Sequence, residues 1–511
     1  MNPRIKGRKI GITMILSVMS IALSIGINFT LTPYITNAVG AEAYGLVSLA
    51  KTFTSYANIF MVALNCYAAR YLTIAYFNKH DKEFNQYFST VFLADVAVGG
   101  ALFIIGTLCV IKLDSLLNIS PELVSDVKLL FFLTFFAFFL TTINTVFNAS
   151  AYVKDHLDLA NIIKVTSYIT EAIILLFCFI VFDASVWYVG VASVGMATIT
   201  LVSSYVMTRK LLPNAHVEIK AFSVDALKRL VGNGLWNSIN SLGNGLNSGL
   251  DLLMTNLMLT GTAMGQISIS KTLTNVVFQL YDAMSQPFQP TFLRKYADGD
   301  KPALLRDITR SMSICGLFTN VVFAGFCAVG KDFLDLWIPT QDTAFIYQLV
   351  IIALLPAISE GCIYPAYYIY TLTLKNKVPC VITILGGVAN VTGMYFLLKY
   401  ASVGAYAILI TTAVVMNFIN LVTNPIYMSI CLKISKTSFY PTLLKNIVCC
   451  AVTTAVLVFV NSIFNFNLSW ITLFVKIVIL AIIGVAFQIP LVLGKDTMSI
   501  IRKVCKMRSE K

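Results

Sequence analysis

The stretch Gly45-Leu-Val-Ser-Leu-Ala-Lys-Thr-Phe-Thr54 recurs later in the chain as Gly265-Gln-Ile-Ser-Ile-Ser-Lys-Thr-Leu-Thr274. Five of the ten positions are identical, and each residue of the second copy follows its equivalent by 220 positions. Self-similarity at a long, fixed displacement is the mark of a duplicated architecture. The repeat therefore predicts two structurally equivalent halves.

The segments that precede the two copies carry matching rows of polar residues. Steps of three and four residues keep these side chains on one helical face, so each segment predicts a helix with a polar stripe. Such a stripe cannot face lipid, and we expect it to line a water-filled cleft. Close packing through small polar residues explains the first stripe equally well and the asparagine-rich second one less well, because a run of amides is more than packing requires. The first stripe is Thr13, Ser17, Ser20, Ser24 and Asn28; the second is Asn233, Asn237, Asn240, Asn244 and Ser248, continued by Asn247 and Asp251.

Composition places both halves in a membrane. The chain has 511 residues, of which 58% are hydrophobic and 12% charged, whereas soluble domains carry roughly 25% charged residues. A spanning helix needs about 20 apolar residues. Fourteen such runs are expected, which leaves no length for an attached catalytic domain. They lie near residues 10–34, 44–69, 86–111, 129–149, 160–182, 185–207, 230–258, 264–288, 311–330, 344–372, 378–398, 403–430, 446–464 and 469–493.

The net charge of +13 marks topology rather than nucleic-acid binding. Cytoplasmic loops of membrane proteins are enriched in Lys and Arg. With fourteen helices, one face of the membrane receives only Lys112, Lys128, Lys331 and Lys399. Thirty of the 37 cations fall on the other face, and three lie within helices. Both termini are therefore predicted to be cytoplasmic.

The predicted organisation is an all-α integral membrane protein with about fourteen transmembrane helices. Two six-helix lobes form a parallel pseudo-twofold repeat and two further helices follow. The first lobe is expected at residues 1–215, the second at 216–437, and the last two helices with a basic cytoplasmic tail at 438–511. The eleven cysteines and three histidines are scattered without ligand spacing, so neither a metal site nor catalytic residues are expected.

Two lysines within predicted helices indicate that the cleft binds an anion. Lys51 and Lys271 are repeat equivalents, and an intramembrane charge is costly and usually functional. A phosphate or pyrophosphate between the two would satisfy both cations. Snorkelling to the interface or pairing with a carboxylate, such as Asp251 for Lys271, are the alternatives. Lys476 lies outside the repeat and is expected to snorkel or to be paired.

Five carboxylates lie in predicted helices. Asp251, Glu171 and Glu360 are candidates for binding a driving cation, although a structural role is as good an interpretation for each. Asp95 and Asp282 complete the set. Four tyrosines follow Glu360 closely in sequence. We favour a place for them in the aromatic belt at the cytoplasmic interface over a role in stacking on sugar rings. The four tyrosines are Tyr364, Tyr367, Tyr368 and Tyr370.

The residues resemble a known family. The stretch Leu31-Thr-Pro-Tyr-Ile-Thr-Asn-Ala-Val-Gly-Ala-Glu-Ala-Tyr-Gly45, with a second helix ending at Arg70, resembles the N-terminal signature of bacterial polysaccharide-biosynthesis flippases. Phe333-Leu-Asp-Leu-Trp-Ile-Pro339, placed after the ninth helix, resembles a second feature, with Pro339 where the family usually has glycine. The resemblance covers most of the chain and indicates the multidrug/oligosaccharidyl-lipid/polysaccharide (MOP) exporter superfamily.

The resemblance implies a non-enzymatic, multi-pass transporter of the bacterial cytoplasmic membrane. Such proteins move undecaprenyl-pyrophosphate-linked oligosaccharide units to the outer leaflet by rocking two lobes around a cationic cavity. No cofactor is expected beyond coupling to an H⁺ or Na⁺ gradient or to the membrane potential. The partners that the resemblance implies are the lipid-linked glycan and the bilayer, with a polysaccharide polymerase and glycosyltransferases as further candidates and without nucleic acid. The expected substrate-binding residues are Lys51, Lys271, Ser24, Asn28, Asn237, Asn240, Asn244 and Asn247.

Two other functions compete with this one. A multidrug/cation antiporter of the same superfamily needs an anionic cavity, whereas here the repeated intramembrane charges are lysines. A membrane-bound glycosyltransferase or ligase needs a large outer catalytic loop, and the longest outer connections, residues 112–128 and 331–343, are short. The glycan and the driving ion stay open.

Overall fold

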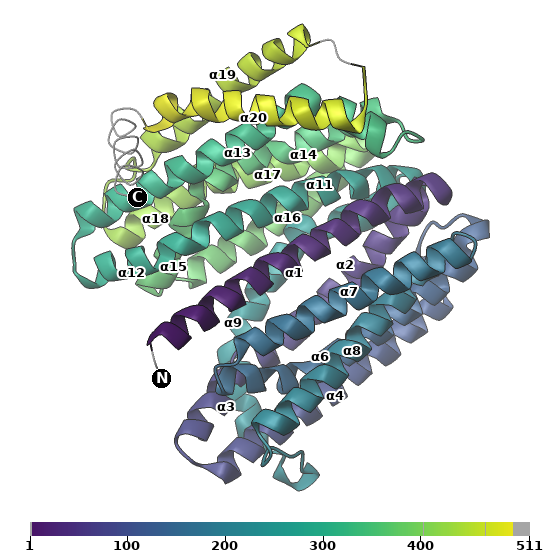
Figure 1. Ribbon diagram of the computed structural model, residues 1–511, viewed down its shortest axis with the longest axis vertical. Helices are drawn as coiled ribbons and strands as arrows, with labels where there is room; N and C mark the ends of the chain where they lie inside the picture. Colours follow the sequence, from purple (N-terminus) through teal and green to yellow (C-terminus); the bar gives the residue numbers. More distant parts are fainter. Residues whose placement is uncertain (1–2, 402, 465–466, 494–511) are drawn as a thin grey trace. The chain divides into compact units, whose positions relative to one another are not determined.

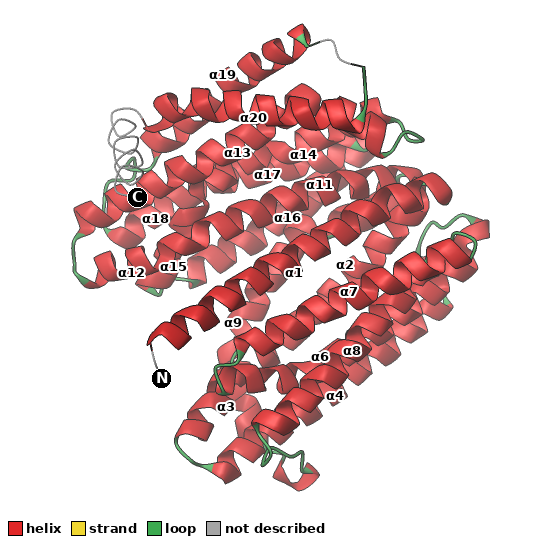
Figure 2. Ribbon diagram, in the orientation of Figure 1, coloured by secondary structure: helices red, strands yellow, loops and turns green. Residues whose placement is uncertain are grey.

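The protein is described by a computed structural model that covers residues 3–401, 403–464 and 467–493. Within these ranges every regular element is a helix, and no strand occurs (Figures 1 and 2). The predicted all-α fold is confirmed. The chain forms two compact units, Met1–Ser268 and Ile269–Lys511. This division describes packing, while the lobe boundaries proposed from the repeat stay a prediction, and the basic tail from residue 494 lies outside the described residues.

The first unit contains ten α-helices and the start of an eleventh among its described residues. They are α1 (Pro3–Ala38), α2 (Ala41–Asn65), α3 (Ala68–Phe77), α4 (Asp81–Ile111), α5 (Leu113–Leu116), α6 (Val124–Val153), α7 (Leu157–Val181), α8 (Trp187–Leu211), α9 (Val224–Ser248), α10 (Leu250–Met258) and α11 (Gly261–Ser285), with short 3-10 turns η1 (Pro121–Leu123) and η2 (Ile219–Ala221). Helix α6 packs against α4 and α8, and α1 packs against α7 and α2.

The second unit takes the rest of α11 and nine further α-helices within the described ranges. They are α12 (Gln289–Ala297), α13 (Lys301–Trp337), α14 (Thr343–Ile363), α15 (Tyr368–Thr373), α16 (Lys377–Tyr400), α17 (Tyr406–Phe418), α18 (Asn424–Leu432), α19 (Tyr440–Ile463) and α20 (Trp470–Leu493), with 3-10 turns η3 (Gln286–Phe288) and η4 (Tyr364–Tyr367) and a π-helical turn η5 (Ile419–Thr423). The long helix α13 packs against α14, α19 and α20 (Figure 1).

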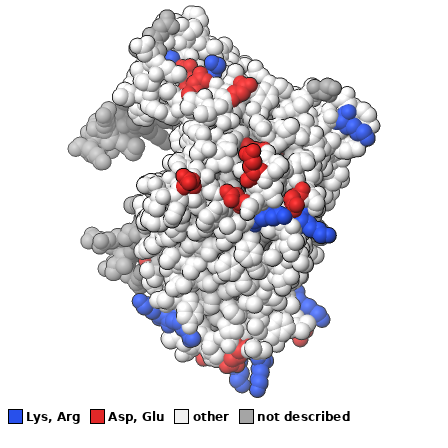
Figure 3. Space-filling view, turned by 90° about the vertical axis from the view of Figure 1, so that its right-hand side faces the viewer, with Lys and Arg blue, Asp and Glu red and all other residues white. Residues whose placement is uncertain are grey.

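Helices occur at all fourteen predicted positions, and twelve of those described are long and apolar enough to cross a membrane. The other two predicted positions are occupied by α9 together with α10, and by α11. Both carry the repeated polar residues, which lower their hydropathy. The number fourteen and the orientation therefore stay predictions. On the face drawn in Figure 3, charged residues occupy a few separate places and most of the surface is uncharged. The chain is a multi-pass membrane protein.

Local signals explain several helix boundaries. Gly40, with φ 109°, separates α1 from α2. The side chain of Asp300 accepts a hydrogen bond from the backbone N–H of Ala303 and caps α13, and Asp342 caps α14 in the same way. Helix α13 consequently starts ten residues earlier than predicted. It also ends at Trp337, so the Phe333–Trp337 motif forms its last turn instead of following it.

In the second unit, the turns η4 and η5 interrupt the runs predicted at 344–372 and 403–430, and in the first unit two predicted helices are interrupted. The second run breaks at Cys66 and Tyr67, between α2 and α3, and the seventh breaks at Gly249, between α9 and α10. Periodicity alone does not predict these breaks, because the apolar pattern continues across them. Each break places the end of one helix inside the first unit.

Candidate functional site

Lys51 lies on α2 against the polar stripe of α1. Its Nζ donates a hydrogen bond to Oδ1 of Asn28 at 3.4 Å, and the amide of Asn28 donates to the carbonyl oxygen of Ser24 at 2.9 Å. All three side chains are half-buried. The structure thus brings together three of the predicted substrate-binding residues, with the ammonium group hydrogen-bonded to a neutral partner.

Glu171 of α7 lies close to the same cluster. Its side chain is buried, and the positive charge of Lys51 acts on its carboxylate. Helix α1 packs against both α2 and α7, so Lys51 and Glu171 lie within range of an electrostatic interaction although they are 120 positions apart. The sequence predicted a role for each residue separately but not their proximity. Together they make a half-buried cation, a carboxylate and an amide in one place.

Helix α9 separates its packing face from its polar stripe. Gly234 and Gly245 lie against α2, and Ser238 donates a hydrogen bond to the carbonyl oxygen of Ile59 at 2.6 Å. A Cβ atom on Gly234 would collide with the carbonyl oxygen of Ala63, so only glycine allows this approach. The small residues therefore face α2 and leave the stripe on another side.

The asparagines of the stripe differ in exposure. Asn237 and Asn244 are exposed, and Asn240 is half-buried. Asn247 is buried, and its amide donates to the carbonyl oxygen of Gly243 at 2.9 Å. If α9 spans the membrane as predicted, its exposed amides require water or a polar ligand rather than hydrocarbon. The side chains of Thr13, Ser17, Asn233 and Ser248 lie outside the described residues.

A cavity of about 560 Å³ opens in the first unit beside α2 and α6. Seven of its eleven lining residues have hydroxyl or amide side chains. The polar residues that line it include Thr54, Ser55, Asn58, Asn65, Thr141 and Thr145. Asp251 is buried in α10 of the same unit, where its charge acts on Tyr56 of α2.

The second unit holds Lys271 on α11 and Glu360 on α14. Glu360 lies beside Tyr281 of α11, a buried residue. Oε2 of Glu360 is buried and has no hydrogen-bond partner among the described residues. Such an oxygen is available to a proton or a cation. The interpretation of Glu360 as an ion-binding residue stays a prediction.

Tyrosines near Glu360 form a hydrogen-bonded network. The hydroxyl of Tyr370 donates to Asn424 at 2.9 Å, and that of Tyr367 donates to Asn420 at 2.7 Å. Tyr364 donates to Asp282 at 3.0 Å. The interfacial-belt interpretation is wrong for Tyr370, which is 7% exposed. Asn420 belongs to the π-helical turn η5, a distortion that often marks functional positions.

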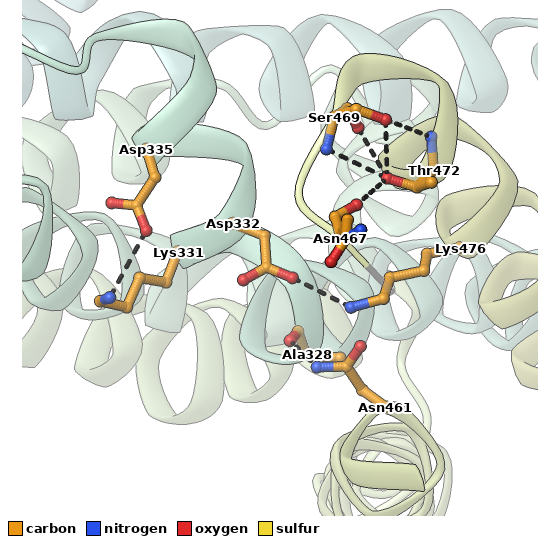
Figure 4. Close-up of polar contacts among 9 residues, drawn as sticks. All are labelled: Ala328, Lys331, Asp332, Asp335, Asn461, Asn467, Ser469, Thr472 and Lys476. Carbon is orange, nitrogen blue, oxygen red and sulfur yellow. Dashed lines mark hydrogen bonds and ion pairs between the residues drawn. The ribbon is translucent and has the colours of Figure 1, made fainter. Parts of the chain in front are cut away.

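Lys476 is explained by an ion pair. Its Nζ lies 3.2 Å from Oδ2 of Asp332, and its side chain is only 10% exposed (Figure 4). The expectation that Lys476 is paired is confirmed. One turn of α13 away, Lys331 and Asp335 form an exposed pair at 3.4 Å. The third intramembrane lysine is therefore part of the packing of α13 against α20.

In the described part of the chain, no three His, Cys, Asp or Glu residues cluster as metal ligands. The ten described cysteines are all free thiols, and Cys505 lies outside the described residues. The chemistry that the described side chains offer is therefore that of lysine ammonium groups, amides, hydroxyls and isolated carboxylates. Groups of this kind are suited to hydrogen bonding and charge pairing with an anionic or polar ligand.

Comparison with known structures identifies the fold. The lipid II flippase MurJ in an inward closed conformation superimposes with a TM-score of 0.66 at 12% identity, covering 93% of this chain and 99% of that one. An inward-facing multidrug resistance MATE family transporter of the MOP superfamily gives a TM-score of 0.63 at 13% identity, covering 83% and 99%. The chain thus has the fold of MOP-superfamily transporters.

Sequence comparison identifies the family. The uncharacterized membrane protein EpsK of Bacillus subtilis (strain 168) is 26% identical over 407 residues, which are 80% of each chain. Residues 12–294, more than half of the chain, match the polysaccharide biosynthesis protein family. The chain therefore belongs to the polysaccharide biosynthesis protein family.

Proposed function

We propose that the protein is a flippase that moves undecaprenyl-pyrophosphate-linked oligosaccharide units across the cytoplasmic membrane for cell-surface polysaccharide biosynthesis. The observation that carries the proposal is the family match over residues 12–294, in a chain whose intramembrane Lys51 lies among amides. The fold is one that a lipid II flippase also has. No covalent chemistry is required of the chain.

Charge explains how such a substrate could cross. Moving a bare pyrophosphate through hydrocarbon costs on the order of tens of kcal/mol. In the proposal, the ammonium of Lys51 and the amides of Asn237 and Asn244 replace its hydration, with Lys271 as a second cation. Glu171 lies close enough to compensate Lys51 when no anion is bound. The polyprenyl tail stays in lipid, and the two repeated halves alternate access.

A multidrug/cation antiporter is the second candidate, because MATE transporters share the fold. Its substrates are cations, which an uncompensated lysine repels. Lys51 has a neutral hydrogen-bond partner, Asn28, and one nearby carboxylate. This arrangement favours an anionic headgroup.

The test is flipping of a fluorescent undecaprenyl-pyrophosphate sugar in proteoliposomes that contain the full-length protein. We expect flipping by the wild type and its loss in Lys51→Ala and Lys271→Ala. Lys331→Ala, which removes an exposed ion-pair lysine, is the matched control and should flip normally. Efflux of cationic dyes without flipping of the lipid-linked sugar would move the assignment to a drug antiporter.

A further inference from the structure

A buried carboxylate outside the proposed substrate site lies in the middle of α4. Asp95 is 0% exposed. Its one hydrogen-bond partner in the described chain is Asn65, whose Nδ2 donates to Oδ1 of Asp95 at 2.8 Å. No lysine, arginine or histidine forms a described ion pair with it. A buried carboxylate held by one neutral donor is far from satisfied.

A single hydrogen atom between two oxygens of this pair would give both of them a hydrogen bond. Oδ2 of Asp95 and Oδ1 of Asn65 are both buried and both lack a hydrogen-bond partner. An ionised carboxylate and an amide oxygen are acceptors only, so neither can serve the other. A carboxylic acid and an amide, in contrast, form a closed pair, in which the amide N–H donates to one acid oxygen and the acid O–H donates to the amide oxygen.

We propose that Asp95 is a proton-binding residue, and that its acid form is held by Asn65 as a two-hydrogen-bond acid–amide pair. In the binding step, a proton from water forms an O–H bond with Oδ2 and removes the negative charge. The new hydroxyl donates to Oδ1 of Asn65. Release reverses both changes, and no oxidant or other reactant takes part.

The titratable groups on the elements packed against α4 interact with other residues. On α9, the guanidinium of Arg229 interacts with the side chains of Tyr87 and Glu83, which lie near the start of α4. Tyr71 of α3 stacks on Tyr87 at 5.1 Å. Other titratable groups on these elements include Lys154, which follows α6 and donates to Tyr76 of α3, Lys220 of η2, Asp225 and Lys228 of α9, Arg70 of α3, Lys51 of α2 and Cys66, which follows Asn65. Among the described residues, none of these groups forms a hydrogen bond or an ion pair with Asp95. Asp95 is influenced by its burial and by the hydrogen bond from Asn65.

The position of Asn65 provides both a route and a gate for the proton. Asn65 lines the 560 Å³ cavity, so water can reach the amide side of the pair. It is also the last residue of α2, directly before the break at Cys66 that leads into α3. A change at this break would withdraw Asn65 and leave Asp95 without a partner. Proton binding is thereby linked to the conformation of α2.

The link to transport rests on the proposed function, whereas the proton site itself does not. The direct test is infrared spectroscopy of the purified full-length protein in lipid vesicles across a pH titration. A protonated carboxylic acid has a carbonyl stretch that a carboxylate lacks. We expect an acid band at neutral pH that Asp95→Asn removes and that Glu171→Gln and Glu360→Gln each leave in place. An identical band in Asp95→Asn and wild type overturns the proposal.

Asp95→Asn should fold, because its amide can donate to Oδ1 of Asn65 as the acid does. If it fails to fold, Asn65→Leu decides, since loss of the amide must shift the frequency of the acid band. An unshifted band in Asn65→Leu overturns the acid–amide pair.

Transport gives a separate result. Wild-type flipping should respond to a pH gradient, and Asp95→Asn should lose that response while retaining flipping without a gradient. A full response in Asp95→Asn overturns the coupling. Absence of flipping in the wild type refutes the proposed function and leaves the infrared result standing.

Discussion

The hydroxyl of Ser268 donates a hydrogen bond to the hydroxyl of Ser48 at 2.5 Å, and the two residues are 220 positions apart, which is the displacement of the repeat. One turn earlier, a Cβ atom on Gly45 would lie 2.8 Å from the backbone nitrogen of Gly265, its own equivalent. Residues related by a twofold operation meet their own equivalents only near its axis. The contact is thus of the kind that a twofold repeat would place near its axis, and the repeat itself stays a prediction.

Cysteines at this contact should cross-link. Hydroxyl oxygens at 2.5 Å place the Cβ atoms of Ser48 and Ser268 within disulfide reach. In a background with Cys66, Cys109 and Cys505 replaced by serine, we expect Ser48→Cys/Ser268→Cys to oxidise rapidly and to stop flipping until reductant is added. Gel mobility after protease cleavage between the sites measures the bond. Ser48→Cys alone is the control, and continued flipping by the oxidised double variant would show that this contact need not open.

Substitution of Gly45 should disturb the same contact between α2 and α11. Gly45→Ala places a methyl group against the backbone of Gly265, which cannot rotate away, so we expect a loss of about 1–3 kcal/mol. The unfolding temperature in detergent measures it. Gly26→Ala on α1 is the matched control, because nothing lies within 4 Å of its Cβ position. Equal unfolding temperatures for the two variants would contradict the close approach.

The charge of Lys51 should matter more than its shape. Lys51→Arg keeps the cation and should retain part of the flipping, whereas Lys51→Gln, which can still bond to Asn28, should lose it. Initial flipping rates at matched protein density measure the difference. If Lys51→Gln flips as fast as the wild type, the anion-binding role of this lysine is wrong.

Removal of Asp332 should destabilise the protein by leaving Lys476 buried without an anion. Because Asp332 is itself 34% exposed, we expect Asp332→Asn to cost about 1–3 kcal/mol, less than a fully buried pair. Thermal unfolding in detergent measures the loss. Asp332→Leu/Lys476→Leu should recover most of it, and the exposed Lys331→Ala should change stability by no more than about 0.5 kcal/mol. No recovery in the double variant would contradict this account.

Asn256 should hold the loop after α5. Its Oδ1 accepts from the backbone N–H of Asn118 at 3.0 Å, its Nδ2 donates to the carbonyl oxygen of Asn118 at 3.0 Å, and it is 0% exposed. We expect Asn256→Ala to raise the hydrogen-exchange rate of the Asn118 amide at least tenfold, since that donor loses its acceptor. Ser115→Ala, in α5 just before the loop, removes a local bond only and should leave that amide unchanged. Unaltered exchange in Asn256→Ala would show that the loop is held elsewhere.

Hydropathy was enough to predict the helical fold, because each span is a nearly continuous apolar run. The polar faces of α1 and α9 were also predictable, since side chains three and four residues apart share a face. Partners across helices were not. Glu171 beside Lys51, Asp332 beside Lys476 and Asn65 beside Asp95 join residues on different helices. Their meeting depends on helix packing, which periodicity does not encode.

The close fit of α9 on α2 has a consequence for biosynthesis. By sequence, α9 opens the second copy of the repeat, yet its Gly234 and Ser238 fill the surface of α2 near Ala63 and Ile59. During translation, α2 enters the membrane about 170 residues before that cover is made. The inserting machinery or lipid must occupy this surface in the meantime. A nascent chain arrested at residue 215 would therefore expose backbone carbonyls on α2 and be a substrate for quality-control proteolysis.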